Sequence, residues 1–116
     1  MKNFVQTGNI LRLTAPSGGV ESGTAYLIGG LLVVALHDAD ATEAFSAVSE
    51  GVVELAKEAT TAAFTEGEIV YWDGTAGQAD ESATGRYPVG TCVSGAIAAD
   101  TTVKLKLFGY ATAAVA

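Results

Sequence analysis

Apolar and polar residues alternate with a period of two in several segments of this chain, and this pattern limits its fold more than any other feature. The clearest case is near the carboxyl end, where Val103, Leu105 and Leu107 alternate with Lys104 and Lys106. Successive side chains of an extended strand point to opposite faces, whereas the apolar residues of an amphipathic helix recur with a period near 3.6. This segment is therefore predicted to be a half-buried β-strand.

Similar segments recur along the 116 residues, separated by turns rich in Gly and Asp. About eight short strands at a spacing of roughly 8–12 residues are typical of a small β-barrel or sandwich. Leu31–Leu36 is apolar throughout and is expected to be a strand covered on both faces, because flanking glycines disfavour a buried helix. The predicted strands are Asn9–Thr14, Thr24–Ile28, Leu31–Leu36, Phe45–Val48, Gly51–Leu55, Glu68–Trp72, a return strand that begins at Gln78–Ala79, Val89–Ser94 and Thr102–Leu107.

The expected architecture is all-β, with at most one short helix and an extended N-terminal arm. Only Ala56–Phe64 looks helical, and its two adjacent threonines limit a helix there to a turn or two. We expect a single domain over residues 1–116, divided into an arm (1–8), a β core (9–108) and a C-terminal tail (109–116). The ends are expected to be held either by a partner or neighbouring subunit or by chance packing of a frayed tail.

Charge and composition exclude several classes of protein. Thirteen acidic residues against six basic ones give a net charge of −7, which argues against binding to nucleic acid or anionic lipid. An apolar content of 49% is too high for a disordered acidic chain. Leu31–Leu36 falls short of the roughly 20 apolar residues that span a bilayer, and Met1–Gln6 lacks a signal-peptide pattern. We therefore expect synthesis in a cytoplasm and no contact with membranes.

Two sequence features suggest chemistry but have simpler explanations. Gly18–Thr24 has the outline of a phosphate-binding loop, yet it lacks the lysine and places Glu21 where phosphate would lie. A glycine-rich connection between strands is the favoured interpretation. Cys92 is the single cysteine, so an internal disulfide is excluded. It is either a small buried apolar residue, which we favour, or a reactive thiol.

The remaining candidates are one histidine and a nearby group of carboxylates. His37 is the sole histidine, and no serine lies in a nucleophile-elbow motif. Asp38, Asp40 and Glu43 are close enough in sequence for a calcium ion but lack the spacing of an EF-hand loop. We predict no catalytic, cofactor-binding or metal-binding residue. An enzyme remains the alternative only if these side chains line a pocket with converging polar groups.

Tyr71 and Trp72 are the most prominent aromatic residues. They could stack on a base or a sugar, but only Lys57 and Arg86 lie near them in sequence, so the positive charge of a nucleic-acid site is missing. One of the two is expected to anchor the core and the other to face a neighbouring element. Tyr71 and Trp72 are therefore predicted to be core or interface residues.

Several motifs, in order over residues 1–107, resemble a family of small phage and prophage proteins. Members are described as capsid cement or head decoration proteins, and others carry the label of RecA/RadA-type recombinases. This chain lacks the length, the phosphate-loop lysine and the basic surface of a recombinase, so we reject that label. The matching segments are 3–8 (Asn-Phe-Val-Gln-x-Gly), 14–23, 51–57, 67–73 (with Val-Tyr-Trp-Asp at its end) and 100–107.

The resemblance implies a virion structural protein rather than an enzyme. It would be made in the host bacterial cytoplasm and bind the outside of the phage head, across seams between major capsid proteins. Related decorators are commonly trimers, so a homotrimer at threefold and quasi-threefold positions is expected, with no cofactor. The alternatives are another virion component, such as a host-binding β-domain of a tail or fibre, or an unrecognised enzyme.

The resemblance also suggests which residues meet the capsid. The arm offers Phe4 and Val5 as apolar anchors, and Asn3 and Gln6 as groups that pair with an exposed strand edge. The alternative is that Phe4 and Val5 pack on their own barrel. Residues 110–116 lie beyond the matching segments, so the resemblance implies nothing about them.

Overall fold

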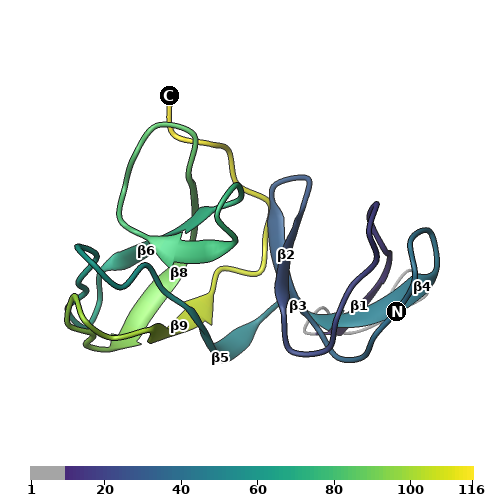
Figure 1. Cartoon of the computed structure of the whole chain (residues 1–116), viewed down its shortest axis with the longest axis horizontal. Helices are drawn as coiled ribbons and strands as arrows, with labels where there is room; N and C mark the ends of the chain where they lie inside the picture. Colours follow the sequence, from purple (N-terminus) through teal and green to yellow (C-terminus); the bar gives the residue numbers. More distant parts are fainter. Residues whose placement is uncertain (1–9) are drawn as a thin grey trace, which may run out of the picture.

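The computed structural model describes residues 10–116 and contains nine β-strands and no helix in that range (Figure 1). This confirms the all-β fold class predicted from the sequence. Each strand coincides with a predicted segment to within about two residues at either end. The strands are β1 (Ile10–Thr14), β2 (Ala25–Ile28), β3 (Leu31–Ala35), β4 (Ala44–Val48), β5 (Gly51–Ala56), β6 (Ile69–Asp73), β7 (Gln78–Asp80), β8 (Tyr87–Ser94) and β9 (Thr102–Leu107).

The strands form two antiparallel sheets. One has four strands in the order β1-β4-β3-β2, and the other has five in the order β5-β9-β8-β6-β7. Lys57, directly after β5, forms a parallel bridge with Ala79 of β7, and the amide of Glu58 donates to the carbonyl of Ala79 at 2.9 Å. The two outer strands of the five-stranded sheet therefore meet at one end, and this sheet curls into a half-barrel (Figure 1).

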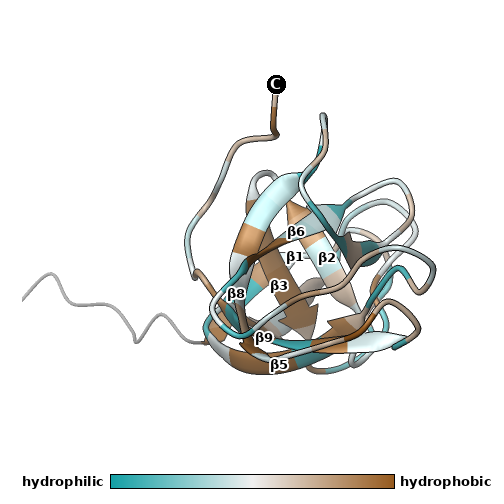
Figure 2. Ribbon diagram, turned by 90° about the vertical axis from the view of Figure 1, so that its left-hand side faces the viewer, coloured by the Kyte–Doolittle hydropathy of each residue, from teal (hydrophilic) through white to brown (hydrophobic). Residues whose placement is uncertain are grey.

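Strand β3 lies between two hydrophobic clusters. Leu32 packs with Trp72 and Leu105 of the five-stranded sheet. Its neighbour Val33 is fully buried in the other cluster, against Phe45 of the four-stranded sheet. Figure 2 shows β3 largely in the brown of apolar residues. Because consecutive side chains of a strand point to opposite faces, an apolar run is required here, as the sequence predicted.

The prediction of a short helix at Ala56–Phe64 is wrong, because the segment is an irregular loop. The carboxylate of Glu58 accepts hydrogen bonds from the backbone amides of Thr60, Thr61 and Ala62 at 2.6–2.9 Å. These amides are occupied by a side chain instead of by carbonyls one helical turn earlier. At its end the loop is extended, because Phe64 and Ala96 exchange two backbone hydrogen bonds of 2.9 Å.

The C-terminal residues 109–116, here called the strap, are held by their own chain. The amide of Thr112 donates to the carbonyl of Gly30 in the β2–β3 turn at 2.8 Å. Further along, Val115 accepts from the amide of Gly85 and donates to the carbonyl of Arg86, both at 2.8 Å. The strap thus joins the four-stranded sheet to the β7–β8 loop, and it rises beside β2 in Figure 1. Backbone hydrogen bonds within the chain hold this end, for which the sequence had left open either a partner or chance packing of a frayed tail.

Candidate functional site

The convex side of the five-stranded sheet carries a row of outward side chains across four strands, all exposed except the half-buried Thr91. Lys106 of β9 is the register partner of Val52 on β5 and of Thr91 on β8, and Thr91 is the partner of Ile69 on β6. Partners directly opposite each other point to the same face. Val52 and Ile69 are 62% and 48% exposed, although their types are usually buried.

A second row runs beside the first. Lys104 is the register partner of Glu54 on β5 and of Ser94 on β8. The register of β8 shifts between Cys92 and Ser94, and Val93 is exposed at this irregularity. We call the two rows together the outer face, which consists of Val52, Glu54, Ile69, Thr91, Val93, Ser94, Lys104 and Lys106.

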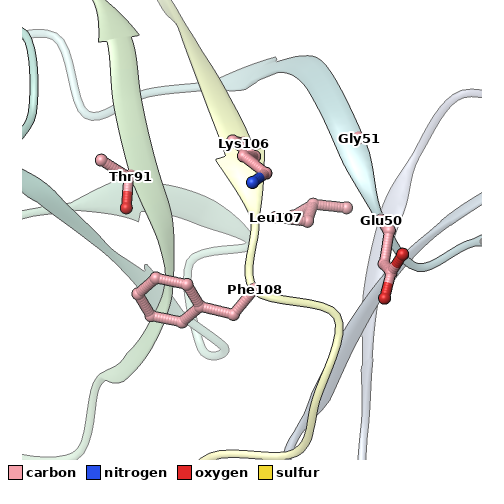
Figure 3. Close-up of a pocket in the computed structure, with 6 residues that line it drawn as sticks. All are labelled: Glu50, Gly51, Thr91, Lys106, Leu107 and Phe108. Atoms are coloured by element: carbon pink, nitrogen blue, oxygen red, sulfur yellow. The ribbon is translucent and has the colours of Figure 1, made fainter.

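A hollow of about 550 Å³ adjoins the outer face where the chain crosses between the sheets. In Figure 3, Glu50 lies on one side of it and Thr91 on the other, with Lys106 and Phe108 between them. The ring of Phe108 stacks on Tyr110, with centroids 5.4 Å apart and planes within 5° of parallel. The hollow is lined by Glu50, Gly51, Thr91, Lys106, Leu107 and Phe108.

Positive charge that is free to meet a partner is concentrated on this outer face. Of the basic residues in the described part of the chain, Lys57 is buried and Arg86 is paired with Asp80 at 3.1 Å. No salt bridge within residues 10–116 engages Arg12, Lys104 or Lys106. Two of these three cations are therefore neighbours on β9, in a chain of net charge −7.

Lys57 has a structural role that the sequence did not indicate. It is 3% exposed, and its Nζ donates to the carbonyls of Glu58, Ala62 and Ala98 at 2.6, 2.5 and 3.2 Å. The ammonium group thus holds the loop after β5 against the loop between β8 and β9. Hydrogen bonds to carbonyl oxygens offset the cost of burying the charge.

Two carboxylates organise the connection between β5 and β6 and have shifted pKa values. The hydroxyl of Thr60 and the backbone amides that follow it hold the pKa of Glu58 well below its usual value. In the same way, the hydroxyl and amide of Thr65 lower the pKa of Glu68. Both shifts arise because hydrogen bonds favour the ionised form, and both carboxylates serve turn formation.

The histidine and the acidic group singled out in the sequence take part in closing loops. Nε2 of His37 accepts from the amide of Ser46 at 3.1 Å. Asp38 accepts from the amide of Ser22, and Glu43 from the amide of Asp40, both at 2.8 Å. Among residues 10–116, no three His, Cys, Asp or Glu side chains are grouped so that they could hold a metal ion.

The glycine-rich loop and the cysteine are also part of the packing. Val20 and Ala39 form an antiparallel bridge, so Gly18–Thr24 lies against the β3–β4 connection. A Cβ on Gly19 would overlap the carbonyl oxygen of Ala39 at 2.6 Å, which explains the glycine. Cys92 is 1% exposed, and its Sγ donates to the carbonyl of Ser94 at 3.2 Å.

The aromatic pair divides between the two sides of β6. Trp72 is 4% exposed and packs in the larger cluster, whereas Tyr71 is half-buried on the opposite side of the strand. The arm residues Asn3, Phe4, Val5 and Gln6 lie outside the described residues.

The outer face is the feature that the sequence analysis missed. The alternation placed Lys104 and Lys106 on the polar side of a strand, but it did not show which residues of other strands lie beside them. Outward apolar positions such as Val52 and Ile69 were the available signal. Only the strand order and register bring them into one row with Lys106.

The structure defines a class: a small two-sheet β protein with a mixed apolar and basic face on one sheet. The sequence model of a family described as phage cement protein matches residues 5–107. The chain therefore belongs to the phage cement protein family, whose members are structural proteins of the phage capsid. No curated protein and no solved structure matches the chain. In the described part of the chain, no helix is long and apolar enough to cross a membrane.

Proposed function

We propose that this protein is a capsid cement protein that binds the outside of the phage head across seams between major capsid proteins. The observation that carries this proposal is the family match over residues 5–107. The fold is compatible with the role, because paired strands around two apolar clusters give a compact body that presents a fixed surface. The proposal includes no catalytic role and no cofactor.

The proposed mechanism is mechanical. Packed DNA exerts pressure on the shell, and a subunit bound across a seam adds an interface that must break before the shell opens. Binding to the closed shell stabilises it by mass action. Many sites act together, so a modest free energy at each becomes large over the whole head. A homotrimer at threefold and quasi-threefold positions would place one subunit against each neighbouring capsid protein.

The N-terminal arm is the proposed second contact with the shell. Phe4 and Val5 would supply apolar anchors, and Asn3 and Gln6 would pair with an exposed strand edge of the capsid protein. The support is the composition of the segment and its resemblance to family motifs, and the family model begins within it, at residue 5. The arm directly precedes β1, an outer strand of the four-stranded sheet.

Co-sedimentation tests the proposed function. The purified protein is mixed with expanded heads that lack it, the heads are pelleted, and bound protein is measured against the capsid protein. We expect saturation at a fixed ratio near one copy per capsid protein, with heads that resist heat better. Deletion of residues 1–8 should weaken binding. Absence of binding to heads shown to be expanded would overturn the proposal and favour a tail or fibre component.

A further inference from the structure

We propose that the outer face of the five-stranded sheet, with its adjoining hollow, is the surface that docks on the capsid shell, and that the shell surface it meets is acidic with apolar residues between the acids. This inference rests on the proposed function and specifies which side of the molecule performs it. The occupant is the capsid protein, a partner that membership of the cement family implies.

Exposed apolar side chains lie on the outer face and beside the hollow. Of the seven large apolar residues exposed in the described chain, Val52, Ile69 and Val93 belong to the outer face, whereas Ile10, Leu36 and Ile97 do not. Tyr110, 60% exposed, stacks on the Phe108 ring beside the hollow. Apolar and aromatic side chains gathered on one face mark an interaction surface, and docking would remove them from water.

The lysines of the outer face favour a partner surface with carboxylates. Lys104 and Lys106 stand on one strand, and no salt bridge in the described residues satisfies them. Glu54, opposite Lys104, is the single carboxylate of the outer face as defined, and Glu50 lines the adjoining hollow. A partner surface with carboxylates would gain charge-assisted hydrogen bonds here. Two copies meeting symmetrically through this face would place lysines against lysines, which opposes such self-association.

The outer face is held rigidly by the sheet and the core behind it. Strands β8 and β9 lie inside the five-stranded sheet, with a hydrogen-bonded neighbour on each side. Behind Lys104 and Lys106, Val103, Leu105 and Leu107 are at most 2% exposed. A face fixed in this way loses little conformational entropy on binding. By contrast, the loop with Asp38, Asp40 and Glu43 is acidic and irregular and offers no cation.

Two charge-reversal variants, whose binding to expanded heads is measured, test the contribution of the lysines. Lys106→Glu and Arg12→Glu change the net charge equally, at exposed cations in different sheets. We expect Lys106→Glu to raise the Kd for heads about tenfold or more and Arg12→Glu to change it less than about threefold. Added salt should weaken binding of the wild type more than that of Lys106→Glu.

A second pair of variants tests the contribution of the apolar side chains to binding. Val52→Ser removes an apolar side chain from the outer face, and Leu36→Ser removes one, 45% exposed, at the end of β3. We expect a several-fold increase in Kd for Val52→Ser and no change for Leu36→Ser. Circular dichroism of each variant confirms folding, and light scattering gives its mass in solution.

Each outcome has a distinct meaning. If the wild type does not bind heads, the proposed function fails and this inference falls with it. If the wild type binds and Lys106→Glu and Val52→Ser bind equally well, the function stands and the docking face is overturned. Equal weakening by Lys106→Glu and Arg12→Glu would show an effect of net charge and would also overturn it. If Lys106→Glu or Val52→Ser no longer binds heads and also has a lower mass in solution than the wild type, the face is a contact between copies. That result would contradict docking on the shell.

Discussion

Lys57 shows how one residue holds two loops together. Its ammonium is buried, has no carboxylate partner among residues 10–116, and donates to three backbone carbonyls. Lys57→Met keeps most of the apolar stem but leaves those carbonyls without their donor. We expect the free energy of unfolding to fall by about 2–4 kcal/mol. Urea denaturation measures this, with exposed Lys104→Met as the control, expected within about 0.5 kcal/mol of wild type. Equal effects of the two substitutions would contradict the role of Lys57.

Glu58 makes stability depend on pH. Its pKa in the folded protein lies below the ordinary value of 4.5, first because of the Thr60 hydroxyl and then because of the following amides. The folded state therefore keeps Glu58 ionised where the unfolded chain binds a proton, so its contribution is complete at neutral pH and is lost as the pH falls below 4.5. Glu58→Gln should lower Tm at neutral pH, and its gap from wild type should narrow with acidification.

The measurement is a series of Tm values from neutral pH to about pH 3 for wild type, Glu58→Gln and a control. Glu66→Gln removes an exposed carboxylate in the loop before β6. Its Tm should stay closer to that of the wild type, at each pH, than the Tm of Glu58→Gln does. A gap for Glu58→Gln that stays constant across this range would show that the ionised form has no special stability in the fold.

At the scale of elements, the strap depends on close passage over the β2–β3 turn. A Cβ on Gly30 would overlap the carbonyl oxygen of Thr112, whereas a Cβ on Gly74 in the β6–β7 turn would meet open space. Gly30→Ala should therefore cost about 1–3 kcal/mol of stability, and Gly74→Ala about 0.5 kcal/mol or less. In a chain without residues 110–116, the cost of Gly30→Ala should disappear. A cost that survives the truncation would place the strain elsewhere than the strap.

The elements also show what the sequence could and could not predict. Strands were predictable where burial is periodic, as in Thr102–Leu107, or complete, as in Leu31–Leu36. The prediction failed at Ala56–Phe64 because two sets of hydrogen bonds shape that loop: backbone amides donate to the Glu58 carboxylate, and the Lys57 ammonium donates to backbone carbonyls. Residue spacing in the sequence does not show these bonds. The outer face was missed because it depends on register: Val52 and Ile69 are 17 residues apart in sequence but lie in one row through Lys106 and Thr91.

For the whole molecule, the question is whether the two sheets unfold as one unit. Strand β3 contributes Leu32 to the larger cluster and Val33 to the smaller one, and the strap binds both the β2–β3 turn and the β7–β8 loop. If β3 leaves one cluster, the side chains on its other face leave the second cluster as well, so both clusters lose packing together. This coupling supports our proposal of a single domain.

Trp72 makes this coupling measurable, because it lies in the larger cluster, while fully buried Phe45 lies in the smaller one. Phe45→Leu should cost about 1–2 kcal/mol and should shift the urea midpoint of Trp72 fluorescence as much as the midpoint of circular dichroism. Leu36→Ala, at an exposed site, should move neither. If Phe45→Leu leaves the urea midpoint of Trp72 fluorescence unchanged, the two sheets unfold as independent units. Coincident shifts would mean that the two sheets unfold as one unit, so that the proposed docking at the outer face and the proposed resistance to internal pressure would draw on the stability of both sheets together.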